Sequence, residues 1–460
     1  MSAFSHVLII GAGTFGATTA LELARLGHQV TIVDRSADGH ASGNAASNDL
    51  NKIIRSDYGD QLYRDLGKKC IALWRSDPLY APFYHEVGII FRSGMPTGPH
   101  SVWIKEGVNF AGQPVMNAYE AASRETRPLA RTITSNEEAK HAFPESLRPH
   151  LGEAFTTFGP GAQTGYFNPQ AGWAEAGNAT FAVLDEAKKL GVKVVSDALI
   201  SKLLFTPGSN NKPRVCGAIT SDGREFRADS VVIAAGSWTP SLLETLQVPL
   251  KEKVLRPSAH CVVTFQLFPE VAELFRGTPV TFNMDSGLYT FEPNADGILK
   301  CAIHKAGSPT PDPRDYNSTE YPRADDHEYV EVMTKELMTM YPILRLDGPN
   351  PTAKRLFTRI CWYCDTADEN FLIDFHPDVD GLLVASGDSG HGLKFMPMIG
   401  RLITSRLLHI DNNSSMVPDY GLSEYQRKVF SYQHHVHATL HDAKPIDSIR
   451  VGGEVVKPKL

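Results

Sequence analysis

The feature that most constrains this chain is an apolar run followed by three regularly spaced glycines. The four branched residues at 7–10 predict a strand that is buried on both faces. Gly11, Gly13 and Gly16 follow in the spacing G-x-G-x-x-G, which permits a tight turn, close approach of a pyrophosphate and packing of the next helix on the strand. The N-terminus of that helix presents free N–H groups to phosphates. The stretch therefore predicts a dinucleotide site.

A second strand and an acidic residue extend this pattern. A helix is expected over 20–26, Gly27 ends it, and the run at 30–33 predicts a strand that Asp34 closes. An acidic side chain about 20 residues beyond the glycines is the expected partner of a ribose hydroxyl. We favour a dinucleotide site over an ordinary glycine turn, although the motif alone serves NAD as well as FAD.

The composition excludes several classes of protein. The 460 residues can bury a large core in two or three domains, and the net charge of −7 offers no basic surface for nucleic acid. The sequence has no apolar run of about 18 residues and no signal-peptide pattern, so neither a membrane span nor secretion is expected. Six cysteines fit a reducing compartment. Residues 457–460 are similar to peroxisomal signals of the S-K-L type except at Pro458, so we expect a peroxisomal or cytoplasmic location.

The order of the remaining patterns predicts an α/β (α+β) fold with an inserted sheet. Apolar runs at 230–235 and 382–386 fit the same layer as the first strand, and the second of them ends in a glycine-rich turn at 387–394. The region 245–355 alternates short strands with turns, which predicts a mixed sheet facing the substrate. The expected division is a discontinuous Rossmann-like domain (1–92, 151–244 and 356–445), a substrate domain (93–150 and 245–355) and a tail (446–460).

A histidine cluster near the end of the chain raises the question of a metal site. It contains His434, His435, His437 and His441. No glutamate or cysteine completes a familiar ligand set, so we expect exposed helical histidines and no metal.

Together these motifs resemble the flavin-dependent amine oxidases related to monomeric sarcosine oxidase and the fungal fructosyl amine oxidases (amadoriases). The most specific stretches are R-I-C-W-Y-C-D-T at 359–366 and F-L-I-D-F-H-P at 371–377. The resemblance implies an FAD-binding domain of the glutathione-reductase/D-amino-acid-oxidase type, with FAD joined covalently to Cys361 through an 8α-S-cysteinyl bond. A metal or redox pair of Cys361 and Cys364 is disfavoured, because zinc would need a second pair and a strand does not suit a thioredoxin motif.

The resemblance also implies four catalytic positions. Lys300 matches a lysine that promotes the reaction of the flavin with oxygen, and a buried ammonium would stabilise the negative charge that develops on oxygen. Alternation along a strand places Lys300 and His304 on one face, so they could share a cavity. Tyr289 and Tyr363 match substrate-facing residues of the sarcosine-oxidase branch.

Substrate and cofactor contacts follow from the same resemblance. Arg55 and Lys394 match two cations that bind a substrate carboxylate. Glu292 matches a glutamate shared with fructosyl amine oxidases, whereas His391 stands where those enzymes have arginine, which makes glycated amino acids doubtful substrates. The residues expected to contact FAD are Gly11, Gly13, Thr14, Phe15, Gly16, Asp34, Arg35, Ser42, Asn48, Lys52, Gly236, Cys361, Asp388, Gly390, His391, Gly392 and Lys394.

The sequence therefore predicts an FAD-dependent oxidase of a secondary amine, such as an N-methyl or N-alkyl amino acid. The products would be hydrogen peroxide and an imine that is hydrolysed or cyclises. The expected partners are a small amine and molecular oxygen, without nucleic acid or membrane, and the protein is expected to be a monomer. Fructosyl amino acid oxidases, saccharopine and pipecolate oxidases, and fungal biosynthetic N-methyl amine oxidases remain alternatives, as do an NAD-dependent dehydrogenase and a non-catalytic flavin-binding subunit.

Overall fold

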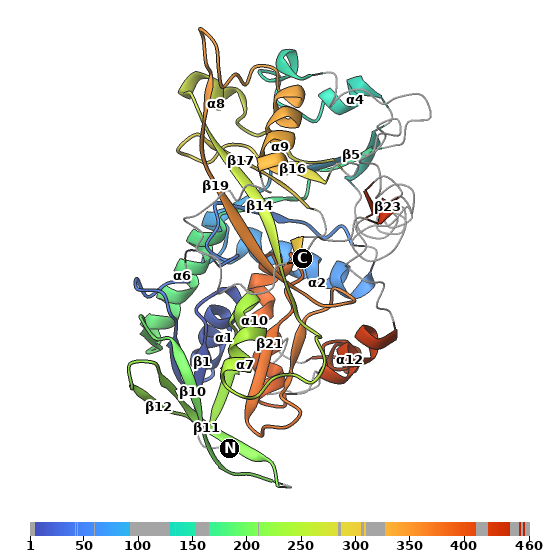
Figure 1. Cartoon of the computed structure of the whole chain (residues 1–460). Coiled ribbons are helices and arrows are strands. Elements are labelled where there is room, and N and C mark those ends of the chain that lie inside the picture. The colour runs from blue at the N-terminus through green and yellow to red at the C-terminus, as the bar shows by residue number, and fades with distance from the viewer. Residues whose placement is uncertain are drawn as a thin grey trace.

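Two large sheets organise the molecule, a six-stranded one in the lower half of Figure 1 and a nine-stranded one in the upper half. Within the part of the chain that the structure describes, no helix is long and apolar enough to cross a bilayer. The computed structural model describes residues 5–41, 43, 45–58, 60–92, 129–133, 135–152, 165–209, 211–283, 287–304, 308–309, 327–410, 422–441, 450–451 and 454–455.

The six-stranded sheet contains the strand that precedes the glycine motif. Its order is β20-β21-β13-β1-β2-β9, and every neighbouring pair is parallel except β20 and β21. Residues 7–10 are buried, as their unbroken run of branched side chains predicts. The strands are β1 (His6–Ile10), β2 (Gln29–Val33), β9 (Lys193–Val195), β13 (Ser230–Ile233), β20 (Leu372–Phe375) and β21 (Leu382–Ser386).

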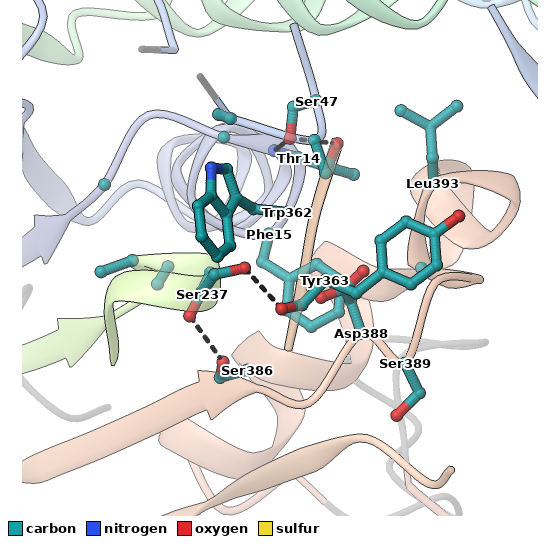
Figure 2. A pocket seen from close by; sticks show the side chains of 18 of the residues that line it. Thr14, Phe15, Ser47, Ser237, Trp362, Tyr363, Ser386, Asp388, Ser389 and Leu393 are labelled. Carbon is teal, nitrogen blue, oxygen red and sulfur yellow. Dashed lines mark hydrogen bonds between the residues drawn. The ribbon is translucent and has the colours of Figure 1, made fainter. Parts of the chain in front are cut away.

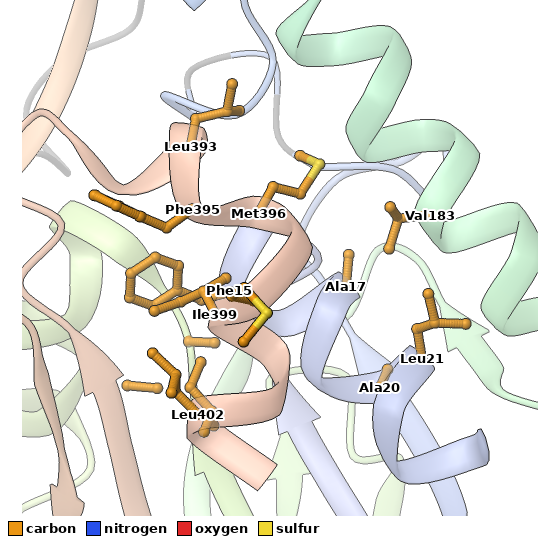
Figure 3. Close-up of a cluster of buried hydrophobic side chains, with 14 of the residues drawn as sticks. Phe15, Ala17, Ala20, Leu21, Val183, Leu393, Phe395, Met396, Ile399 and Leu402 are labelled. Carbon is orange, nitrogen blue, oxygen red and sulfur yellow. The ribbon is translucent and has the colours of Figure 1, made fainter. Parts of the chain in front are cut away.

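Three helices pack beside this sheet, and α1 (Thr14–Arg25) lies between α10 (Met396–Leu407) and α6 (Ala176–Lys189) (Figure 3). The facing surfaces are apolar and small, so the helix axes approach closely. A Cβ on Gly400 of α10 would lie 2.4 Å from the backbone of Thr18, and glycine at this position therefore permits the close packing.

The nine-stranded sheet is mixed, since β5 and β15 are parallel and its other pairs are antiparallel. Its order is β18-β14-β17-β16-β15-β5-β7-β6, with β19 paired to β14. The strands are β5 (Ile89–Arg92), β6 (Arg131–Ile133), β7 (Gly165–Asn168), β14 (Arg256–Leu267), β15 (Val280–Asn283), β16 (Leu288–Thr290), β17 (Ile298–Ile303), β18 (Ser308–Pro309) and β19 (Ala353–Asp365).

The two long strands β14 and β19 run from the upper sheet down towards the six-stranded sheet (Figure 1). The expected α/β (α+β) fold with an inserted mixed sheet is confirmed. Three strands lie outside the expected domain boundaries: β5, β7 and all of β19 pair in the nine-stranded sheet, although the sequence placed 1–92, 151–244 and 356–445 in the other domain. An apolar strand does not reveal in its own sequence which sheet it joins.

The remaining elements cover the two sheets or link them. The helices are α2 (Gln61–Ser76), α4 (Asn136–Lys140), α7 (Thr239–Thr245), α8 (Pro269–Leu274), α9 (His327–Met340), α11 (Glu424–Val429) and α12 (Tyr432–His441), with short 3₁₀ turns at η1 (Ala81–Phe83), η3 (Arg148–His150), η4 (Gly236–Trp238) and η7 (Gly392–Phe395). The small sheets contain β3 (Lys52–Ile54), β4 (Tyr84–His85), β8 (Gly172–Ala174), β10 (Ile200–Pro207), β11 (Pro213–Thr220), β12 (Glu225–Arg227), β22 (Arg450–Val451) and β23 (Glu454–Val455).

Candidate active site

The glycine motif after β1 forms a turn that requires glycine. Gly11 has a φ of +112°, and a Cβ there would lie 2.3 Å from the carbonyl oxygen of Ala234. A Cβ on Gly16 would lie 1.9 Å from the carbonyl oxygen of Gly11, so a larger residue would push α1 off the strand. Gly13 is the N-cap of α1, and the first N–H groups of a helix have no partner within it. This geometry suits a pyrophosphate at the start of α1.

Asp34 follows β2 at the same edge of the sheet. Its carboxylate accepts hydrogen bonds from the backbone N–H groups of Ala12 at 2.7 Å and Ser36 at 2.9 Å. Burial raises the pKa of Asp34, although both hydrogen bonds act to lower it. The Arg35 guanidinium lies 4.4 Å from the centre of the Trp238 ring. Asp34 is thus anchored where the motif predicts a partner for a ribose hydroxyl.

One cavity of about 520 Å³ extends from this turn to the nine-stranded sheet. At one end the Thr14 and Ser47 hydroxyls hydrogen bond at 3.0 Å, and deeper in the wall Ser237 donates to the carbonyl oxygen of Tyr363 at 2.7 Å (Figure 2). The predicted residues that line this cavity are Gly11, Gly13, Thr14, Phe15, Asp34, Arg35, Lys52, Arg55, Gly236, Tyr289, His304, Tyr363, Asp388, Gly390, His391, Gly392 and Lys394.

Other predicted residues lie outside the lining. Gly16 acts through helix packing, and the Asn48 side chain donates to the carbonyl oxygen of Ala41 at 3.2 Å. Ser42 lies outside the described residues. The remaining three are Lys300, Cys361 and Glu292.

Lys300 and Cys361 lie behind the cavity wall and beside Lys52, which lines it. The Lys300 ammonium donates to Asp49 Oδ2 at 2.6 Å and to the carbonyl oxygen of Asn51 at 2.7 Å. The Lys52 ammonium also pairs with Asp49, and it lies 3.5 Å from Cys361 Sγ. The structure therefore brings Lys300, Lys52 and Cys361 together in one polar cluster around Asp49.

Aromatic side chains form the wall of the cavity on the side of the nine-stranded sheet. The Tyr289 ring stacks on Phe282 at 5.8 Å between centres, and the Tyr363 ring stacks on His260 at 3.7 Å. Burial raises the pKa of both tyrosines. Burial is also the largest cause that lowers the pKa of His304 well below its usual value, and the neighbouring His260, Arg55 and Lys394 add to it. At neutral pH the wall therefore presents neutral phenol and imidazole groups.

Two cations lie at the other side of the cavity, around one tyrosine ring. The Arg55 guanidinium is 4.6 Å and the Lys394 ammonium 5.6 Å from the centre of the Tyr58 ring. Lys394 donates to the carbonyl oxygen of His391 at 3.1 Å, and His391 Nδ1 lies 3.1 Å from the Tyr58 hydroxyl. Burial and the charge of Arg55 lower the pKa of Lys394 well below its usual value. An anion bound between Arg55 and Lys394 would raise the pKa of Lys394 again and so favour its charged form.

The surroundings of Glu292 differ from the expectation. The Glu292 carboxylate accepts hydrogen bonds from Trp173 Nε1 at 3.0 Å and from the Gly277 N–H at 2.6 Å, outside the cavity lining, so its contacts join β8 to the segment between α8 and β15. Cys364 is three residues from Cys361 in the same strand, and side chains at odd spacings point to opposite faces. Both cysteines are free thiols.

The histidine cluster differs from the expected exposed face. His435 is buried because α12 packs on the loop before β20: its Nε2 lies 3.0 Å from the carbonyl oxygen of Phe371 and its Nδ1 3.3 Å from Asp368. His434 Nε2 also lies 2.7 Å from Asp368. Within the described ranges no group of side chains could hold a metal ion.

A chain of three polar residues was missed in the sequence. His260 Nε2 lies 3.0 Å from the Ser258 hydroxyl, which donates to Asp365. When Asp365 is ionised, the Ser258 hydroxyl gives its proton to the carboxylate and accepts from His260, so the ring proton then lies on Nε2. Burial raises the pKa of Asp365 to about 7 and lowers that of His260 to about 3. The alternation of side chains along a strand could have predicted that Ser258 and His260 share one face. The sequences of β14 and β19 do not reveal that these strands pair, so the contact with Asp365 could not be predicted.

The comparison with known proteins decides the family. A family profile described as "FAD dependent oxidoreductase" matches residues 6–406. The chain belongs to this family. FAD is therefore the cofactor class, the NAD-dependent reading is set aside, and the family expected from the sequence is confirmed.

Curated relatives and solved structures agree with this assignment. The chain is 27% identical to the amino acid oxidase imqH of Aspergillus flavus over 93% of this chain and 97% of that one, and 27% identical to the L-saccharopine oxidase of Schizosaccharomyces pombe over 87% and 89%. It is 25% identical to a monomeric sarcosine oxidase of Bacillus sp. over 89% and 93%. The structure of Amadoriase I, a fructosyl amine:oxygen oxidoreductase of Aspergillus fumigatus, matches with a TM-score of 0.71 and 28% identity over 96% of this chain and 91% of that one.

Proposed function

We propose that this protein oxidises a secondary amine that carries a carboxylate, such as an N-methyl or N-alkyl amino acid, with oxygen as the electron acceptor. The products are an imine, which is hydrolysed or cyclises, and hydrogen peroxide. The observation that carries the proposal is one cavity that connects the glycine turn with the cations Arg55 and Lys394 through an aromatic wall. Similarity to sarcosine and saccharopine oxidases supports an amine as the substrate.

The residues at the nucleotide end fit FAD. Gly11, Gly13 and the first N–H groups of α1 would hold its pyrophosphate, and Asp34 would bind a ribose. When bound, FAD would accept the two electrons and the hydrogen that leave the carbon next to the amine nitrogen as the C–N bond becomes C=N, and would pass them on to oxygen. The protein supplies binding, orientation and a water-poor environment.

We further propose that FAD is attached covalently to Cys361. The thiol is 1% exposed, and its sulfur lies 3.5 Å from the ammonium of Lys52, a residue that lines the cavity, so Cys361 lies directly behind the wall against which the flavin would bind. Acid denaturation tests the link: the flavin colour is expected in the protein pellet. Transfer of all of the colour to the supernatant would contradict it.

The substrate end suits a carboxylate next to a neutral amine. Arg55 is 7% exposed and Lys394 lies beside it, so a carboxylate between them would be bound with little competition from water. The two cations also disfavour a protonated amine, and loss of that proton frees the nitrogen lone pair for oxidation. His304 lines the cavity, and its lowered pKa keeps the ring neutral, so it adds no charge beside the amine.

A fructosyl amine oxidase is the second candidate function, because the solved amadoriases have the same fold over almost the whole of this chain. The site disfavours it. His391 occupies the position of the arginine in that group, and Glu292 is engaged with Trp173 and Gly277 away from the cavity. Saccharopine and pipecolate also carry a carboxylate that Arg55 and Lys394 would bind, so both are included in the test below.

The test is anaerobic mixing of the purified flavoprotein with sarcosine, N-methyl aromatic amino acids, pipecolate, saccharopine and fructosyl-lysine. Bleaching of the flavin by a carboxylate-bearing secondary amine, followed by peroxide formation when oxygen is admitted, is the expected result. Failure of every amine to bleach the flavin would contradict the function. A monomer on sizing chromatography and a location in peroxisomes or cytoplasm also remain predictions.

A further inference from the structure

Asp49 lies between the ammonium groups of Lys300, which is buried, and Lys52, which lines the cavity. Its side chain is 2% exposed and that of Lys300 is 0% exposed, and the Lys300 ammonium donates to Asp49 Oδ2 at 2.6 Å. The Lys52 ammonium pairs with the same oxygen. The carbonyl oxygen of Asn51 accepts the second hydrogen bond of Lys300 at 2.7 Å. One carboxylate therefore links two lysines from strands β3 and β17, which are far apart in the sequence.

The cluster has more positive than negative charge. The Arg359 guanidinium donates to the carbonyl oxygens of Asn48 and Ala45 in the loop that carries Asp49, and its charge acts on Asp49 as well. The other ionisable groups with the largest effect on Lys300 are Lys52, on β3, and Cys361, on β19. Asp49 is the carboxylate that pairs with Lys300 in the part of the chain that the structure describes.

The protonation of Lys300 depends on this carboxylate. Burial and, to a smaller extent, the charge of Lys52 lower the pKa of Lys300, the charge of Asp49 opposes both, and the net result is a pKa of about 8. Burial acts to raise the pKa of Asp49, but Lys300 and Lys52 outweigh it and hold that pKa well below its usual value. Asp49 therefore stays ionised over the pH range in which Lys300 titrates, and Lys300 loses its proton as the pH rises through about 8.

We propose that Asp49 is a positioning residue that holds Lys300 protonated and fixed in place, and so sets the upper pH limit of the reaction of the reduced enzyme with oxygen. The inference rests on the proposed oxidase function. The ammonium stabilises the negative charge that forms on oxygen as electrons reach it, and the neutral amine does not. Asp49 touches neither oxygen nor the cavity, and it acts through Lys300 and Lys52.

Stopped-flow mixing of reduced enzyme with oxygen between pH 5.5 and 9.5 tests the proposal. The rate of the wild type is expected to fall as the pH rises through about 8. In Asp49→Asn this fall should move to lower pH by about 1 to 3 units, which is the size of the effect of one adjacent opposite charge. Asp185→Asn, which removes an exposed carboxylate on α6, is the matched control and should leave the profile unchanged.

Two further measurements separate the possible outcomes. Lys300→Arg keeps its charge over this pH range, so the fall should disappear in this variant and in Asp49→Asn/Lys300→Arg. A pH titration of the visible flavin band in the oxidised, substrate-free protein should show the same shift between wild type and Asp49→Asn, independently of turnover.

A fall that stays at the wild-type pH in Asp49→Asn, or that persists in Lys300→Arg, would overturn the inference. The second result does so even if Asp49→Asn does not fold. If no amine yields peroxide, the proposed function fails instead, and the spectral titration still decides the role of Asp49.

Discussion

Gly390 offers a direct test of whether the position of Tyr363 controls oxidation. Gly390 has a φ of +70°, and a Cβ there would lie 2.2 Å from one ring carbon of Tyr363 and 2.6 Å from the next. The ring cannot yield freely, because His260 stacks on it at 3.7 Å. Gly390→Ala therefore forces the phenol to move by about 1 Å, and a displacement of that size in a catalytic arrangement costs on the order of 100-fold in rate.

The chain contains a matched control for this change. Gly39 also has a φ of +70°, but a Cβ there would meet nothing within 4 Å. Both alanine variants should lose about 1 to 2 kcal/mol of stability, because a side chain disfavours the left-handed region. Only Gly390→Ala should also slow the reduction of the flavin by an amine, measured under nitrogen in a stopped-flow instrument. The reasoning would be refuted if the two variants reduced at the same rate, or if Gly39→Ala were as slow as Gly390→Ala.

Three further predictions concern the flavin, the substrate and the histidine cluster. Cys361→Ala should release all of its flavin on acid denaturation, whereas the wild type should keep it in the pellet. Lys394→Met should raise the KM of a carboxylate-bearing amine about 10- to 100-fold, since a charged hydrogen bond contributes roughly 1.5–3 kcal/mol, and should leave the KM of the matching methyl ester almost unchanged. Burial acts to raise the pKa of Asp368, but hydrogen bonding and charge from His435 outweigh it, so the pKa of Asp368 is lower in the folded than in the unfolded protein. Ionised Asp368 therefore stabilises the folded protein above about pH 4, and this contribution is lost as the pH falls. Asp368→Asn should therefore unfold more easily at pH 7, by roughly 1.5–3 kcal/mol in urea titration, while the difference from the wild type should shrink in acid.

The local patterns in the sequence were sufficient to predict the nucleotide-binding βαβ unit. The run of branched residues, the three glycines and Asp34 all act within about 30 residues, which is the length of one βαβ unit. The structure confirms β1, α1 and β2 in this arrangement, and Gly11 and Gly16 occupy positions where a Cβ would collide with backbone.

The contacts that shape the rest of the site join distant segments. Asp49 and Lys300 are separated by 251 residues, and His260 on β14 lies directly opposite Cys361 on the neighbouring strand β19. No rule based on sequence spacing reveals either pair. Glu292 shows a different limit of sequence comparison. It matches a glutamate of the fructosyl amine oxidases, but that match does not reveal that its carboxylate accepts hydrogen bonds from Trp173 and Gly277. Side-chain direction depends on register, and register depends on the whole sheet.

The hydrogen-bonded pair of β14 and β19 has a consequence for how the molecule can move. Cys361 and Tyr363 sit on a strand whose other end belongs to the upper sheet, and β14 also holds β17, the strand of Lys300. Both strands run from one half of the molecule to the other, so opening the two halves as rigid bodies would have to bend this hydrogen-bonded ribbon. We therefore expect entry and exit to depend on local movements of connecting loops, and new selectivity to arise by altering those loops while the strand pair stays constant.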